Sequence, residues 1–170
     1  VHTRPSPARS AAAASGSRNG APAACICMIR KATCDDIPAI LALGKELHAK
    51  VGGLPEIDMN GCRQLLAQAV FHKRRLVLVA VKDGVITGFF FGMIEELFFS
   101  KSHYASDVVI YATDGMSGAL MIRRFIRWVK AMGVVQIQLG VSSGLNIDRT
   151  DTLYQKLGLK RVGALYQGTL

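Results

Sequence analysis

The spacing of hydrophobic and polar positions changes several times along the chain, and each change predicts an element. Apolar side chains recur at helical spacing in segments 37–47, 59–72 and 120–132. Arginine and lysine occupy the opposite face of the third segment. A shorter helix is predicted from Asn146 to Lys156, where Gly158 would end it.

Runs of β-branched and aromatic residues predict strands between these helices. Segments 76–81 and 85–91 flank Asp83-Gly84, a dipeptide typical of tight hairpin turns. A third strand is expected at 107–112, so three successive strands are antiparallel. Shorter strands are predicted at 28–32, at 134–141 and within 159–170. The order β-α-α-β-β-β-α-β-α-β predicts a single α+β (mixed α/β) domain.

Residues 1–27 differ in composition from the rest of the chain. Ala, Ser, Gly, Pro and Arg dominate them, and no acidic residue occurs. Such a segment buries too little apolar surface to offset its ordering entropy, so a disordered leader is expected. Its arginines also resemble those of an organelle transit peptide. The abrupt start of patterned sequence favours a mis-called gene start, with Met28 as the first residue and 28–170 as the domain.

Composition narrows the class of protein. The chain has 170 residues, and 50% of them are hydrophobic, which suits one buried core. The richest apolar stretch, 89–94, stops at Glu95, well short of the roughly 20 residues of a membrane span. No membrane partner is therefore expected. The net charge of +9 attracts polyanions, but no long basic run or aromatic stacking motif supports nucleic-acid binding.

The four cysteines carry no sign of a metal site. Cys25, Cys27, Cys34 and Cys62 lack the paired spacing of zinc ligands. Reduced thiols in a cytoplasmic protein, with no metal, are the expectation.

Segment 110–119 is the best candidate for chemistry. Its pattern predicts a strand, a tight turn of small residues and the start of a helix. The free N–H groups and the positive dipole end of such a helix bind anions, and small residues let a ligand approach the backbone. A cofactor that carries a diphosphate fits these features, although many glycine-rich turns serve only close packing.

Several motifs resemble the GNAT N-acetyltransferase family over residues 28 to about 166. The opening MIRKATCDDIPAI is similar to the family's first strand and helix. The family's pyrophosphate loop has Gln or Arg, two residues, Gly, one residue, then Gly or Ala; the equivalent positions here are Asp114, Ser117 and Ala119. The overall sequence most resembles GNAT-like proteins encoded by bacterial phages and prophages.

The C-terminal part carries a second motif of the family. Asn146, followed by Leu153-Tyr154 and Gly158-Leu159, resembles the family's Asn…Tyr…Gly-Phe ending, with one extra residue before the tyrosine. The resemblance implies a single-domain GNAT fold, in which helices flank a central, mostly antiparallel sheet.

The resemblance also implies an acyltransferase that binds acetyl-CoA. An acceptor amine would attack the thioester of acetyl-CoA directly. Tyr154 matches the family's general acid, and Asn146 matches a residue that orients CoA or the tyrosine. Packing and helix capping are the alternative roles of these two side chains. The expected cofactor-binding residues are Ile110, Tyr111, Ala112, Gly115, Met116, Ser117, Gly118, Ala119 and Asn146.

Three carboxylates are candidates for the general base that deprotonates the amine. His103, nearby in sequence, is a fourth candidate, although a loop histidine is more often simply exposed. Asp107 stands where related proteins often carry an acidic residue. Glu95 and Glu96 end the Phe-rich strand, where solvated charges are also common. Strict alternation would place Asp107, Val109 and Tyr111 on one face of their strand.

Asp114 departs from the family's Gln or Arg. A carboxylate facing the diphosphate would repel it by roughly 1–4 kcal/mol at about 4 Å, whereas one that caps the helix would not. In the first case the alternative is a catalytically degenerate GNAT-fold protein with a binding or virion-assembly role. Phe89–Phe91 and Phe98-Phe99 could then form an interface, although core packing is favoured.

The acceptor amine has no diagnostic motif. Polyamines, aminoglycosides, peptide N-termini and lysine side chains are all open, and the net charge favours an acidic or neutral acceptor. A homodimer would also fit. A serine-hydrolase interpretation of 115–119 fails, because no histidine follows Ser117 as that family's chain order requires.

Overall fold

The computed structural model describes residues 27–141 and 143–163. The predicted leader lies outside these residues except for Cys27, and so does the last part of the terminal strands expected within 159–170. The described part of that segment, residues 159–163, forms no strand. The element order agrees with the sequence prediction as far as the last helix.

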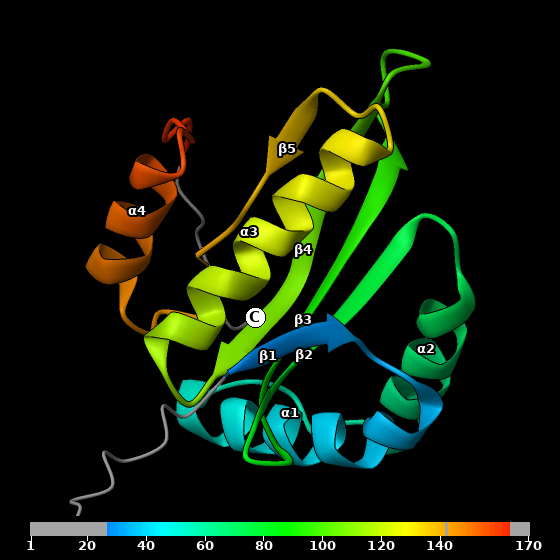
Figure 1. The fold of residues 1–170 in the computed structure, drawn as a ribbon, viewed down its shortest axis with the longest axis vertical. Coiled ribbons are helices and arrows are strands. Elements are labelled where there is room, and N and C mark those ends of the chain that lie inside the picture. Colours follow the sequence, from blue (N-terminus) through cyan, green and yellow to red (C-terminus); the bar gives the residue numbers. More distant parts are fainter. Residues whose placement is uncertain (1–26, 142, 164–170) are drawn as a thin grey trace, which may run out of the picture.

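One five-stranded sheet forms the centre of the molecule (Figure 1). The strands lie in sequence order, and every neighbouring pair is antiparallel except the last, which is parallel. They are β1 (Met28–Lys31), β2 (Arg75–Lys82), β3 (Val85–Glu96), β4 (His103–Ala112) and β5 (Gln136–Gln138).

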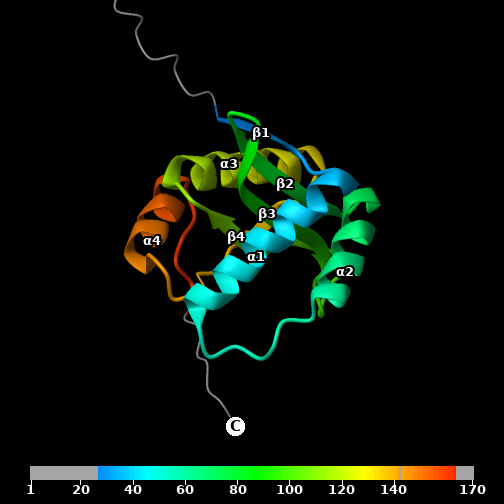
Figure 2. The ribbon, with the colours of Figure 1, turned by 90° about the horizontal axis from the view of Figure 1, so that it is seen from below.

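Helices cover both faces of this sheet. Figure 2 shows α1 and α2 on one face and α3 on the other, so the domain has three layers. A short 3-10 turn, Cys34–Asp36, leads into the first helix. The helices are α1 (Ile37–Val51), α2 (Met59–Phe71), α3 (Gly115–Ala131) and α4 (Ile147–Lys156).

The turn between β2 and β3 is the predicted hairpin. Asp83 and Gly84 have φ angles of 51° and 79°. Positive φ at both central residues is the geometry of a two-residue turn whose twist matches the flanking strands, and Asp and Gly accept it at low cost.

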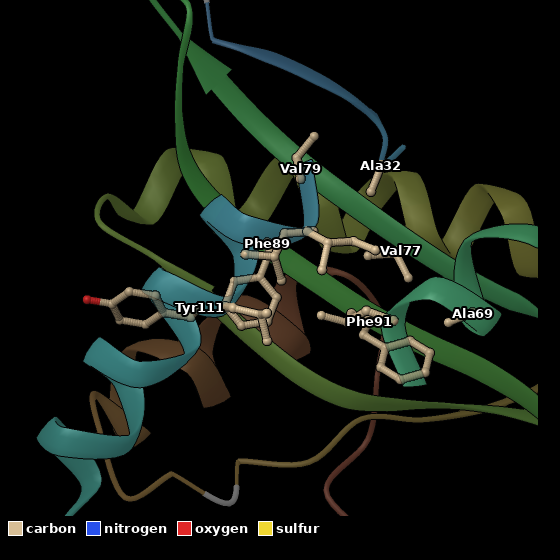
Figure 3. Packing of buried hydrophobic residues seen from close by; sticks show 11 residues of the cluster. Ala32, Ala69, Val77, Val79, Phe89, Phe91 and Tyr111 are labelled. Carbon is tan, nitrogen blue, oxygen red and sulfur yellow. The ribbon is translucent and has the colours of Figure 1, made fainter. Parts of the chain in front are cut away.

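The aromatic run of β3 is divided between the two core layers. Phe89 and Phe91 pack with α1 and α2, as Figure 3 shows, whereas the Phe90 ring lies 4.7 Å from the Phe125 ring of α3. The core interpretation is therefore confirmed for residues 89–91. Phe98 and Phe99 lie beyond the strand and are 92% and 95% exposed.

The start of α1 is fixed by a buried acid. The Arg30 guanidinium donates two hydrogen bonds, of 2.6 and 2.8 Å, to the Asp36 carboxylate. The Thr33 amide donates a third, of 2.7 Å. These bonds tie the first strand to the first helix, and they lower the pKa of Asp36 to about 2.

Candidate active site

The sheet opens into a cleft where β4 and β5 part. The two strands pair only from Tyr104 to Ser106 of β4, after which β4 continues to Ala112 paired with β3 but not with β5. The cleft has a volume of about 1110 Å³. Its walls come from α1 and the loop after it, β4, the N-terminal part of α3, and residues within 140–141 and 143–156. In Figure 1, β5 and α4 lie beside β4 on that side of the sheet.

Asp107 stands where the strands part. Its Oδ1 accepts the Gly140 amide proton at 2.8 Å, so a side chain takes the place of a strand carbonyl. This bond accounts for the end of β5 at Gln138, short of the residue 141 that the sequence predicts. At the other end, the Val134 amide donates to Val129 of α3 instead of joining the strand. Burial raises the pKa of Asp107 above its usual value.

A bulge corrects the predicted faces of β4. Val109 pairs with Phe91, and Asp107 pairs with Gly92, which leaves Val108 as the extra residue. Asp107 therefore shares the face of Gly92, where an added Cβ would meet Phe125 of α3. The prediction that it shares a face with Val109 and Tyr111 is wrong, because strict alternation holds only in an unbulged strand.

Tyr154 lies in the cleft on α4, beside Asp107. It is 7% exposed, and its hydroxyl donates to the Gly140 carbonyl at 3.3 Å. Burial, and then the negative charge of Asp107, raise the pKa of Tyr154 far above its usual value. The phenol therefore stays protonated at neutral pH and is a proton donor.

Asp114 caps α3. Its Oδ1 accepts the Ser117 amide proton at 2.8 Å, and its Oδ2 accepts the Ser117 hydroxyl at 2.7 Å. These bonds lower the pKa of Asp114, so it is a carboxylate at neutral pH. The side chain of Ser117 is fully buried and also lies 3.1 Å from the Cys27 sulfur. Of the two orientations that the sequence left open, the structure has the capping one.

Arg149 is a cleft residue that the sequence analysis missed. It projects from the first turn of α4 over Gly115, the first residue of α3, where an added Cβ would collide with its guanidinium. Within the described residues, its side chain makes no hydrogen bond or ion pair. A free cation therefore lies at the end of the cleft where the diphosphate was expected. A basic residue in a helix's first turn, where the dipole disfavours it, was the available signal.

Most of the expected cofactor-binding residues line the cleft. Met116 and Ser117 do not, because Met116 faces solvent and Ser117 is buried. The backbone of Asn146 is in the left-handed region, and its side-chain amide makes no hydrogen bond that caps α4. The expected residues in the lining are Ile110, Tyr111, Ala112, Gly115, Gly118, Ala119 and Asn146.

A polar cluster joins α1 to β4. The Tyr111 hydroxyl, which leaves the core cluster in Figure 3, donates to Glu46 Oε1 at 2.6 Å. Lys50 donates to the same oxygen at 2.7 Å and lies over the Tyr111 ring. The Lys50 and Tyr111 hydrogen bonds lower the pKa of Glu46. The sequence analysis missed this cluster, although Glu46 and Lys50 have the spacing of a helical ion pair.

Two of the candidate carboxylate bases lie outside the cleft. Glu95 and Glu96 are exposed at the end of β3 and are not part of the cleft lining. Glu95 accepts from the Tyr104 hydroxyl at 3.0 Å, and Glu96 lies 3.4 Å from Arg74. Of the three carboxylates, Asp107 is the one that the structure brings next to Tyr154.

The described residues contain neither a metal-binding cluster nor a membrane-spanning helix. No group of three or more His, Cys, Asp or Glu side chains there could hold a metal ion. None of the described helices combines the length and apolar character needed to cross a bilayer.

Known structures have the same fold. A predicted acetyltransferase from Clostridium acetobutylicum, solved with acetyl-CoA, matches with a TM-score of 0.67 at 17% identity, over 85% of this chain and 96% of that one. This chain has the GNAT acetyltransferase fold. No protein-family model matches the sequence, and no curated protein matches it closely.

Aminoglycoside acetyltransferases are among the similar structures. One, from an uncultured soil metagenomic sample in complex with sisomicin, has a TM-score of 0.63 at 13% identity, over 85% of this chain and 96% of its own. Another, a 6'-N-acetyltransferase from Acinetobacter haemolyticus, has a TM-score of 0.62 at 16% identity, over 84% and 97%. At these identities the likeness concerns the fold.

Proposed function

We propose that this chain is an N-acetyltransferase that moves an acetyl group from acetyl-CoA to an amine by direct attack in a ternary complex. The observation that carries the proposal is the cleft between β4 and β5, where a protonated Tyr154 and the Asp107 carboxylate lie side by side. The acetyl-CoA complex of the similar Clostridium structure supports the choice of cosubstrate.

The residues at the α3 end of the cleft fit the diphosphate of acetyl-CoA. The capping role of Asp114 occupies both its oxygens, so its charge is directed at Ser117. Gly115 has no side chain of its own, and the Arg149 guanidinium that lies over it supplies positive charge at this end of the helix. We assign Arg149 and the Gly115 backbone to the diphosphate, in place of the family's Gln or Arg.

The proposed chemistry divides between two side chains. Bound acetyl-CoA supplies a thioester, whose carbonyl carbon forms the new bond to nitrogen as the carbon–sulfur bond breaks. Asp107 accepts a proton from the ammonium form of the acceptor, because only a neutral amine has a lone pair for attack, and passes it to solvent. Tyr154 donates its proton to the leaving sulfur and recovers one from the acylated nitrogen. The raised pKa of Asp107 moves this base toward neutral pH, and the raised pKa of Tyr154 keeps the phenol protonated until the sulfur leaves.

Calorimetry with acetyl-CoA and a thiol-release assay with a panel of amines test this function. The wild-type chain should bind acetyl-CoA at micromolar concentration and release CoA only when an amine is present. Tyr154→Phe should bind acetyl-CoA equally well but lose about 10²–10⁴-fold in kcat. Tyr104→Phe is the matched control, because Tyr104 lies outside the cleft lining. No acetyl-CoA binding at millimolar concentration would refute the proposal.

One observation favours a second candidate, a GNAT-fold assembly module. Phe98 and Phe99 form an exposed edge-to-face pair, with ring centroids 4.8 Å apart, in the loop between β3 and β4. Self-association that persists at high salt and is lost in the Phe98→Ser, Phe99→Ser double variant would support that role. A monomer at all concentrations would oppose it.

A further inference from the structure

The α1 side of the cleft limits the kind of amine that the proposed reaction can use. The diphosphate end is built from α3 and α4, which leaves the wall formed by α1 and the loop after it for the acceptor. Figures 1 and 2 both show the C-terminal end of α1 on the same side of the molecule as α4. The side chains of this wall are Leu47, His48, Val51, Leu54 and Ile57.

This wall is apolar and carries no acid. Its one ionisable side chain is His48, whose Nε2 lies 2.7 Å from the Pro55 carbonyl. That hydrogen bond joins the loop to α1 and so positions Leu54 and Ile57 over the cleft. An acceptor bound here would meet hydrocarbon around the amine that it presents.

Two of the three carboxylates near this wall are engaged, and the third lies outside the lining. Glu46 is bound by Lys50 and by the Tyr111 hydroxyl. Asp58 caps α2 by accepting from the Asn60 and Gly61 amides. Glu56, an exposed residue of the loop, is not part of the lining. A second ammonium group on the acceptor would thus find no free carboxylate among the described lining residues of this wall.

The charges in the rest of the described lining also disfavour an acceptor with several ammonium groups. Its two acids are Asp107, which binds the Gly140 amide, and Asp114, which caps α3. Arg149 and Lys156 add positive charge, and the whole chain carries +9. This field repels a polycation before it reaches the cleft.

We propose that the acceptor is a single amine on an apolar body, such as an arylalkylamine or the N-terminus of a hydrophobic peptide, and that polyamines and aminoglycosides are rejected. This inference rests on the proposed acetyltransferase function. The α1 wall holds the apolar body while Asp107 and Tyr154 act on the amine. The apolar contacts provide affinity, and the positive field provides discrimination.

Matched acceptors test the proposal on the full chain. With acetyl-CoA saturating, we expect kcat/KM for phenethylamine and leucinamide to exceed that for spermidine by about tenfold or more, since each 1.4 kcal/mol of discrimination is a factor of ten. A preference for spermidine would overturn the inference and leave the acetyltransferase function intact. Acetyl-CoA binding without turnover of any amine would overturn it too. Failure to bind acetyl-CoA would instead refute the proposed function itself.

A charge placed on the wall provides the second test. Leu54→Asp should lower kcat/KM for phenethylamine about tenfold and raise it for spermidine. Leu65→Asp is the matched control, because Leu65 on α2 is 43% exposed, compared with 39% for Leu54, and lies outside the lining. Equal effects of the two variants on both acceptors would contradict an acceptor site at this wall. Unchanged melting temperatures would show that both variants fold.

Discussion

The Asp107 carboxylate accepts the Gly140 amide proton at 2.8 Å, and the Tyr154 hydroxyl donates to the carbonyl of the same glycine at 3.3 Å. One peptide segment thus holds the two side chains to which we assign proton transfer. Asp107 also ends the pairing of β4 with β5, so the residue that opens the cleft is also our candidate base.

The pH dependence of the reaction should report the ionisation of Asp107. A base acts only when deprotonated, and burial raises the pKa of this carboxyl. The acid limb of kcat/KM should therefore lie above pH 3.8, with the rate rising as pH increases through the raised pKa. In Asp107→Asn this limb should disappear, while an amide oxygen can still accept from Gly140.

The comparison of two Asp107 variants separates chemistry from structure. Asp107→Ala loses the acceptor of the Gly140 amide and should lower the melting temperature as well as activity. Asp107→Asn should lower activity alone. A wild-type acid limb that persists in the Asn variant would assign the base to another group.

Gly115→Ala and Arg149→Gln should have the same effect on cofactor binding. The added methyl group displaces the Arg149 guanidinium, the mobile end of a long side chain, so folding should be preserved. We expect the dissociation constant of acetyl-CoA to rise about 10–100-fold in both variants, as for loss of a charge-assisted hydrogen bond. Calorimetry measures this directly.

Two controls accompany these variants. Arg124→Gln removes an equal charge from the exposed face of α3 and should leave the affinity nearly unchanged. Asp114→Asn keeps a capping oxygen, and because the Asp114 carboxylate is directed at Ser117, it should leave the affinity for acetyl-CoA nearly unchanged. If Arg149→Gln binds acetyl-CoA as the wild type does, the diphosphate assignment is wrong.

Asp36 should make stability depend on pH below pH 4. Its folded pKa is about 2, mainly because Arg30 donates to it, and its unfolded value is near 3.8. The stabilisation is therefore complete above about pH 4 and is lost as pH falls towards 2. Asp36→Asn should cost about 1–2 kcal/mol at pH 7, since Arg30 is partly exposed and screened.

Urea unfolding at pH 7 and at pH 2 measures this difference. The gap between wild type and Asp36→Asn should shrink at pH 2, because Asp36 is then about half protonated in the folded chain and almost fully protonated in the unfolded chain. Asp35→Asn is the neighbouring control, since Asp35 is exposed. An equal gap at both pH values would mean that the ion pair with Arg30 is not its cause.

The two groups of phenylalanines should differ sharply in their contribution to stability. Phe90 is fully buried against Phe125, so Phe90→Ala should cost about 3–5 kcal/mol of unfolding free energy. Phe98→Ser and Phe99→Ser should each change it by less than about 0.5 kcal/mol, because both rings are exposed. Denaturant titration of a dilute sample measures these unfolding free energies. A large loss of stability in either serine variant would show that the Phe98–Phe99 pair is buried in solution.

The sequence predicts the elements well wherever the signal is local. The hairpin at Asp83-Gly84 depends on turn chemistry within a few residues, and it is present. The turn of small residues expected at 115–119 is instead the first part of α3, which begins at Gly115 after the Asp114 cap. The position of Tyr154 in the cleft was predicted by resemblance to a family motif. The extent of β5 was not predicted, because the Asp107 side chain that replaces its hydrogen bonds lies far away in sequence.

The sequence by itself determined the order of elements, the two-sided burial of the Phe-rich strand and the nature of the candidate residues, since periodicity and capping act over short distances. Only the tertiary structure decided three further points. It turned Asp107 to the other face through the Val108 bulge, directed Asp114 at its own helix, and brought Arg149 over Gly115. Each of these points depends either on residues that are distant in sequence or on which of two local hydrogen bonds forms. A pattern of apolar and polar positions carries no information about either.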